Sequence, residues 1–152
     1  MKSIFAVAVA VLSLGYFSPA AANPCELTIT GNDQLQFNKS ELVVPASCDE
    51  VTVTLEHVGK LPVDAMGHNW VLTQTSDFNS VAQAGMKAGK ASDYVPQGDD
   101  RVIAATDLVG GGESTSVTFD VSALEAGGDY TFFCSFPGHY AAMNGKFIIK
   151  SE

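Results

Sequence analysis

Three side chains that bind soft transition metals lie close together near the C-terminus. They are Cys134, His139 and Met143, in the pattern Cys-x4-His-x3-Met. Far upstream, His68 follows Gly67 and offers a second imidazole. A thiolate, two imidazoles and a weakly bonding thioether form the ligand set of a blue-copper electron-transfer site, because sulfur stabilises Cu(I) and imidazole accepts Cu(II). The four side chains together therefore predict a mononuclear copper site.

Two other kinds of chemistry could use parts of the same set. Zinc binds Cys and His, but structural zinc sites take four strong ligands and a thioether suits zinc poorly. A hydrolase could use Cys134 as its nucleophile and His139 as its base, and it would then need a third group to orient the histidine. Met143 has no role in such a scheme, so we favour copper over both alternatives.

The N-terminal segment differs in composition from the rest of the chain. Lys2 is followed by a mostly apolar stretch over residues 4–17 and then by small residues and a proline over residues 18–22. This order is typical of a secretory signal, and the apolar stretch is short for a membrane-spanning anchor. We therefore predict that residues 1–22 are a signal peptide cleaved after Ala22, and that residues 23–152 form a single domain.

Export to an oxidising compartment changes the interpretation of the three cysteines. Two of them would pair and one would remain. Cys25 and Cys48 form the natural pair, whereas the alternative pairings would use Cys134, which has the metal-binding neighbours. Closing the loop between Cys25 and Cys48 would stabilise the fold by about 3 kcal/mol in the chain-entropy treatment. The remaining thiol of Cys134 then needs an explanation, and a bound metal supplies one.

The composition excludes several classes of protein. Hydrophobic residues make up 46% of the 152 residues and charged residues 16%, which is enough apolar material for a core. A net charge of −9 argues against nucleic acid as a partner, because that requires a basic surface. The body of the chain has no apolar run long enough to span a membrane.

Short segments of alternating apolar and polar residues dominate the body of the chain and predict half-buried strands. A helix is expected after Ser76 and Asp77, which could cap it, with Gly89 as its end. The pattern favours an all-β, two-sheet antiparallel sandwich with Greek-key connections, about eight strands and one short inserted helix. The expected strands cover residues 26–30, 42–44, 51–55, 69–74, 101–105, 114–121, 129–134 and 146–150.

The sequence resembles the azurins, which are bacterial members of the cupredoxin family. The resemblance spans essentially all of residues 23–152, and the spacing of the loop that contains Cys134 and His139 is specific to azurins within that family. It implies a cupredoxin fold. The segments that carry the resemblance are residues 31–37, 66–72, 101–104, 116–122 and 132–139.

The resemblance also implies a role for each residue of the site. His68, Cys134 and His139 would be the three strong copper ligands. Met143 would be a long axial ligand, and the carbonyl group of Gly67 a weak contact on the opposite side.

Residues around the ligands are assigned by the same resemblance. Asn69 would tie the two ligand loops together, partly through Ser135. The backbone N–H groups of Asn69 and Phe136 would donate to the sulfur of Cys134 and tune the reduction potential. The family's N-terminal disulfide corresponds to Cys25 and Cys48, in agreement with the cysteine count.

The implied function is a soluble one-electron carrier, which is not an enzyme and cycles one copper ion between Cu(I) and Cu(II). The implied location is the periplasm, and the protein would act as a monomer without a membrane or nucleic-acid partner. Its transient partners would be larger redox proteins such as c-type cytochromes or copper or haem reductases. Storage and delivery of copper is the alternative function. Electrons would leave through an apolar surface around the edge of His139, called the exit patch here: Leu35, Leu61, Met66, Met86, Phe136, Pro137, Gly138, Ala141 and Ala142.

Two further aromatic residues lie outside the implied ligand set. In some azurins the histidine that matches His57 titrates and couples weakly to the copper, and a half-buried structural histidine is the alternative. Trp70 is the only tryptophan, and we expect it in the core.

Overall fold

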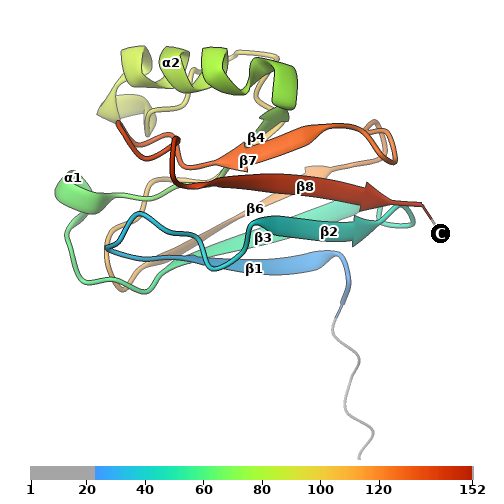
Figure 1. Ribbon diagram of the computed structural model, residues 1–152, viewed down its shortest axis with the longest axis horizontal. Helices are drawn as coiled ribbons and strands as arrows, with labels where there is room; N and C mark the ends of the chain where they lie inside the picture. The colour runs from blue at the N-terminus through green and yellow to red at the C-terminus, as the bar shows by residue number, and fades with distance from the viewer. Residues whose placement is uncertain (1–22, 152) are drawn as a thin grey trace, which may run out of the picture.

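The computed structural model describes residues 23–151, which form two β-sheets packed face to face (Figure 1). The expected signal peptide lies outside the described residues. The predicted all-β sandwich of eight strands is confirmed. The smaller sheet has the order β1 (Glu26–Gly31), β3 (Glu50–His57), β6 (Ser114–Asp120). The larger sheet has the order β2 (Glu41–Pro45), β8 (Asn144–Lys150), β7 (Tyr130–Phe133), β4 (Val71–Gln74), β5 (Ala104–Ala105).

Alternation of apolar and polar residues places the core between the sheets. In β3 every second side chain is buried, beginning with Val51. Successive side chains of a strand point to opposite faces, so one face of each sheet turns inward. Trp70 is fully buried in this core, as expected, and its ring packs against Phe132 and Phe147.

Two strand pairs are parallel, which corrects the expectation of an antiparallel sandwich. β1 pairs with β3, and β2 pairs with β8, in parallel register. Between β1 and β3 the chain passes through the other sheet as β2, which is the kind of long connection that parallel neighbours require. Alternation of side chains does not depend on strand direction, so the sequence pattern could not distinguish the two arrangements.

Two expected strands are shorter in the structure. The strand expected over residues 69–74 begins only at Val71, because the Trp70 N–H donates to the hydroxyl group of Thr106. The strand expected over residues 101–105 is reduced to Ala104–Ala105. Its first part is a turn, in which the Arg101 N–H donates to the carboxylate of Asp99.

The inserted helix is α2 (Phe78–Ala88), which covers the outer face of the larger sheet (Figure 1). Val81 and Ala82 pack on Val71 of β4 and Phe133 of β7. This contact explains why all four side chains of β7 are buried instead of alternating. A strand covered on both faces has no polar side.

The ends of α2 agree only in part with those predicted from the sequence. Gly89 ends the helix, as predicted, and its backbone has φ 77° and ψ 179°, a combination that glycine adopts far more readily than other residues. The predicted start of the helix is confirmed in position, because Asp77 is its N-cap residue. Asp77 makes no side-chain cap bond within the described chain, however, and residues Thr75–Asp77 form a 3-10 turn (η1). A second short helix, α1 (Val63–Met66), was not predicted, since four residues carry too little periodicity to detect.

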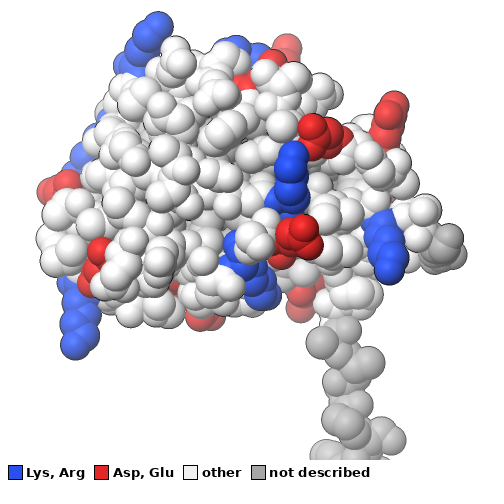
Figure 2. All heavy atoms as spheres, viewed as in Figure 1, with Lys and Arg blue, Asp and Glu red and all other residues white. Residues whose placement is uncertain are grey.

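The disulfide joins Cys25 to Cys48, which confirms the predicted pairing and links the start of β1 to the turn before β3. Acidic and basic side chains are interspersed on the face in Figure 2, with no large area of one sign. Within residues 23–151, no helix combines the length and apolar character needed to cross a membrane.

Candidate metal centre

The register of the larger sheet brings the ligand loops together. Val71 of β4 lies opposite Phe133 of β7, and Phe133 lies opposite Asn144 of β8. These pairs are antiparallel, so the residues before β4, after β7 and before β8 meet at one end of the sheet. His68 precedes β4, Cys134 follows β7, and Met143 precedes β8.

Three of the predicted ligand residues form a compact buried group. Cys134 Sγ lies 3.8 Å from His68 Nδ1 and 3.6 Å from His139 Nδ1. The three candidate ligand atoms all lie within 4.8 Å of one another. Cys134 and His68 are fully buried, and His139 is 5% exposed. Within the described chain Cys134 takes no part in a disulfide, so its sulfur is available to a metal.

A backbone contact fixes the orientation of the His68 ring. His68 Nε2 lies 2.9 Å from the carbonyl oxygen of Asn32, which can only accept a hydrogen bond. Nε2 therefore carries the proton, and Nδ1 presents its lone pair toward Cys134. Asn32 was not recognised from the sequence as a contact of His68, although it lies in the segment 31–37 that carries the resemblance. Metal-binding histidines typically donate their other ring N–H in this way.

The loop from Cys134 to Met143 is closed by its own backbone. The Met143 N–H donates to the His139 carbonyl at 2.8 Å, and the Cys134 N–H donates to the Met143 carbonyl at 3.0 Å. Gly138 has φ 85°, a conformation that other residues rarely adopt, and it allows the turn before His139. Hydrogen bonds within the loop therefore help to hold His139 in place.

The two other predicted contacts lie beside the group. Met143 is fully buried, and a Cβ placed on Gly31 would lie 3.4 Å from its methyl carbon and 2.8 Å from the His68 ring. Gly31 therefore leaves the space into which both side chains fit. The carbonyl oxygen of Gly67 lies 3.9 Å from the sulfur of Cys134.

Burial keeps all three candidate ligands uncharged. Desolvation raises the pKa of the Cys134 thiol to about 12, although N–H groups of Asn69 and Phe136 act in the opposite direction. Desolvation, with a smaller contribution from the neighbouring imidazoles of His68 and His57, lowers the pKa of His139 to about 4. The pKa of His68 is also lowered, mainly by burial. A thiolate–imidazolium pair, which a Cys–His hydrolase needs, is disfavoured by these surroundings.

The geometry fits a bound transition metal. A metal bonded at about 2.3 Å to sulfur and about 2.0 Å to nitrogen, with an angle of about 110–120° between the bonds, holds those atoms about 3.5–3.7 Å apart. The observed sulfur–nitrogen distances of 3.6 and 3.8 Å lie within about 0.1 Å of this range. One soft sulfur and two buried imidazoles suit copper, which would replace the thiol proton on binding.

Asn69 connects the two ligand loops. Its Nδ2 donates to Ser135 Oγ at 2.7 Å, and its Oδ1 accepts from the Ser135 N–H at 2.8 Å. Both residues are buried, so water does not compete for either hydrogen bond. The amide of Asn69 thereby holds the residue after His68 against the residue after Cys134.

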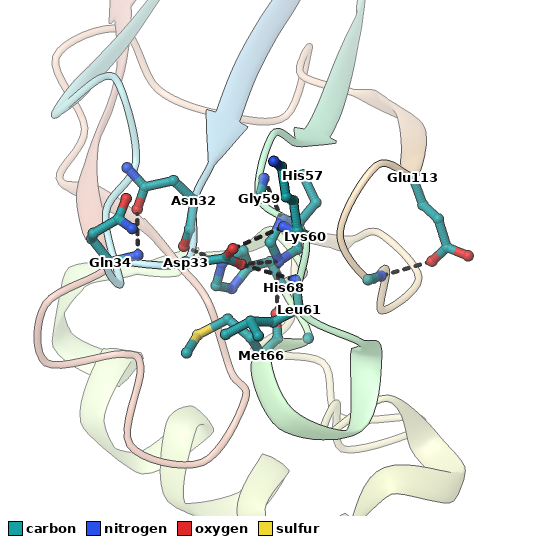
Figure 3. Close-up of polar contacts among 12 residues, drawn as sticks. Asn32, Asp33, Gln34, His57, Gly59, Lys60, Leu61, Met66, His68 and Glu113 are labelled. Atoms are coloured by element: carbon teal, nitrogen blue, oxygen red, sulfur yellow. Dashed lines mark hydrogen bonds and ion pairs between the residues drawn. The ribbon is translucent and has the colours of Figure 1, made fainter.

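His57 lies beneath the group and is buried, being only 1% exposed. Its ring stacks on His68 with centroids 4.3 Å apart. Its Nε2 donates to the Met66 carbonyl at 2.8 Å, and its Nδ1 accepts from the Gly59 N–H at 3.0 Å, which fixes the neutral tautomer (Figure 3). The structural interpretation of His57 is therefore supported by the geometry, since the ring supports a ligand.

Asp33 joins the loop after β1 to the loop after β3 (Figure 3). Its carboxylate accepts from the N–H groups of Lys60 and Leu61. The Lys60 N–H has the larger effect and lowers the pKa of Asp33. Asp33 was also not recognised from the sequence, because nothing in the segment 31–37 indicates which distant N–H groups its carboxylate contacts.

The residues of the expected exit patch are mostly accessible. Leu61 is 41% exposed and Met86 is 37% exposed. Leu35, Met66 and Phe136 are half-buried, and the remaining members, Pro137, Gly138, Ala141 and Ala142, are exposed. The Phe136 ring lies 4.5 Å from that of His139, measured between centroids. The candidate ligand His139 thus packs against Phe136, a half-buried apolar member of the expected exit patch in the same loop.

A β-sandwich with a buried His–Cys–His group at one end is the arrangement typical of blue-copper proteins. Comparison with known proteins agrees: residues 23–150 match the family described as copper binding proteins, plastocyanin/azurin family. The chain belongs to this family.

Individual relatives are similar over nearly their whole length. The chain is 54% identical to azurin from Achromobacter denitrificans, covering 99% of this chain and 98% of that protein. It is 50% identical to azurin from Pseudomonas aeruginosa, covering 94% and 96% respectively. Among solved structures it resembles an azurin (Az-iso2) from Methylomonas sp. strain J, with TM-score 0.79 and 48% identity, covering 84% of this chain and 98% of that one.

Proposed function

We propose that this protein is a soluble electron carrier of the periplasm, exported by a cleaved signal peptide over residues 1–22. When bound, copper supplies the one-electron Cu(I)/Cu(II) couple. The observation that carries the proposal is the buried His–Cys–His group, whose ligand atoms lie within 4.8 Å of one another in loops closed by their own hydrogen bonds. Such a site changes little between oxidation states, and this lowers the barrier to electron transfer.

Each residue has a defined part in this proposal. His68, Cys134 and His139 would hold the copper ion as strong ligands, and Met143 and the carbonyl group of Gly67 would be weaker contacts. Asn69, Ser135 and the N–H group of Phe136 orient Cys134 and tune the potential. The exit patch excludes water while a partner such as a c-type cytochrome or a copper or haem reductase is briefly bound.

Storage and delivery of copper is the alternative. A delivery protein exchanges its metal with a partner and needs accessible ligands. Burial of Cys134 and His68 favours retention instead.

The deciding experiment follows both electrons and copper. The reduced protein is mixed with an oxidised c-type cytochrome, and copper loss to a Cu(I) chelator is measured separately. Electron transfer that is fast compared with copper loss supports the carrier. Copper transfer to the chelator that outpaces electron transfer would favour delivery.

A further inference from the structure

The turn that follows α2 contains two consecutive residues in a conformation that side chains disfavour. Asp93 has φ 53° and Tyr94 has φ 55°. The left-handed region costs a residue other than glycine about 1 kcal/mol or more, and such residues persist where the surroundings hold them in place. We call residues 89–95 the brace turn. It is closed by hydrogen bonds from Asp93 N–H to Lys90 O and from Tyr94 N–H to Gly89 O.

The two strained residues contact both ligand loops. The carbonyl group of Asp93 accepts a hydrogen bond of 2.8 Å from Asn69 Nδ2, the same amide that holds Ser135. The ring of Tyr94 packs edge-on against Phe136 with centroids 5.3 Å apart. Phe136 in turn lies against His139, at 4.5 Å between centroids. The brace turn therefore contacts one residue in each ligand loop, Asn69 and Phe136, and these contacts do not involve the candidate ligands themselves.

The rest of the molecule is arranged to hold the brace turn in this position. A Cβ on Gly85 of α2 would collide with the Tyr94 carbonyl oxygen, so glycine permits the close approach. Lys90 forms an ion pair with Asp64 of α1, which precedes Gly67 and His68. Val95 is buried against the same cluster as Phe133 and Val71.

We infer that Asp93 and Tyr94 are positioning residues that pre-form the copper site, and that the strain in their backbone is maintained for this purpose. This inference rests on the proposed function. Asp93 acts through its backbone carbonyl group, which fixes the Asn69 amide, and Tyr94 acts through its ring, which holds Phe136 over His139. Loosening either contact lets water approach His139, which favours the more highly charged Cu(II) and lowers the reduction potential.

Two pairs of variants test the inference. Asp93→Val and Asp93→Gly both remove the carboxylate, but only glycine adopts the left-handed conformation without strain. Tyr94→Ala removes the ring, and Tyr94→Phe keeps it. Val53→Ala, in β3 of the other sheet, controls for a general loss of stability.

In the metal-free protein the readout is hydrogen exchange of the Ser135 N–H, which donates to Asn69. We expect Asp93→Val and Tyr94→Ala to speed this exchange and to weaken Cu(I) binding about tenfold relative to Cu(II) binding, the lower end of the loss when a group behind a metal ligand is removed. A tenfold shift in preference for Cu(II) over Cu(I) lowers the one-electron potential by about 59 mV. Asp93→Gly, Tyr94→Phe and Val53→Ala should leave the potential near that of the unmodified protein.

Unchanged exchange and potential in both Asp93→Val and Tyr94→Ala would overturn the inference. Equal effects of Asp93→Val and Asp93→Gly would also overturn it for Asp93, since the carboxylate and not the backbone would then matter. A protein that forms no blue copper complex would refute the proposed function, while the exchange measurement on the metal-free protein would still test the brace turn.

Discussion

The protonation state of Cys134 determines what copper binding must displace. Its pKa of about 12 means that the metal-free protein carries a protonated thiol at neutral pH, beside two neutral imidazoles. Only the thiolate binds metal well. We therefore expect each bound copper to release about one proton at pH 7. Calorimetry in two buffers with different protonation enthalpies measures this number, and release of none or of two would contradict it.

His139 makes the metal-free protein sensitive to acid. Its pKa falls from 6.5 to about 4 on folding, because burial disfavours the charged ring. The unfolded chain therefore takes up a proton first, so the free energy of unfolding should decrease as the pH falls from about 6.5 to about 4. Below that window this residue should have no further effect. Urea denaturation across the range should show a shallower dependence in His139→Asn, and an equally steep one would contradict the assignment.

At the scale of elements, α2 depends on one glycine. An alanine in the middle of a helix normally stabilises it by about 1 kcal/mol relative to glycine. At Gly85 the added Cβ would collide with the Tyr94 carbonyl oxygen, so we expect Gly85→Ala to lower the free energy of unfolding by about 1–3 kcal/mol instead. Gln83→Ala, at an exposed position of the same helix, is the control and should change little. Denaturant titration of the unmodified protein, Gly85→Ala and Gln83→Ala measures the free energy of unfolding of each. A stabilised Gly85→Ala would contradict this account and show that the brace turn moves freely.

The disulfide stabilises the fold by joining the residue before β1 to the turn before β3. It closes a separation of 23 residues between Cys25 and Cys48. Replacing both cysteines by serine should lower the free energy of unfolding by about 3 kcal/mol, chiefly by freeing the unfolded chain. The visible spectrum of the copper form should stay the same, because the bond lies outside the ligand loops. A changed spectrum would show that the disulfide also shapes the metal centre.

Some helices and strands could be predicted from the sequence more accurately than others. β3 alternates along its whole length and could be predicted almost to its ends. The turn at Arg101 and the parallel pairing of β1 with β3 depend on contacts between distant segments, which local patterns do not record. The ligand types of Cys134 and His139 were evident from the sequence. The hydrogen bond from His68 to Asn32 was not, because a backbone carbonyl group supports the ligand and any residue could supply it.

At the scale of the whole molecule, the surface around His139 should govern encounters with partners. Met66 belongs to the exit patch and is half-buried. Met66→Lys should slow electron exchange, because a charge in an apolar contact must be desolvated, while the copper spectrum stays unchanged. Val43→Lys is the matched control, since Val43 is an accessible apolar residue of β2, 45% exposed, outside the patch. Stopped-flow rates that fall equally in both variants would point to net charge, and unchanged rates in Met66→Lys would count against the patch.

The central claim is that the buried His–Cys–His group holds one redox-active copper ion. The most direct measurement is a visible absorption spectrum of the purified protein during titration with Cu(II) and then with ascorbate. We predict an intense band from sulfur to copper that saturates at about one equivalent, is bleached by the reductant and is absent in Cys134→Ser. A protein that stays colourless, or that binds only zinc, would contradict the account.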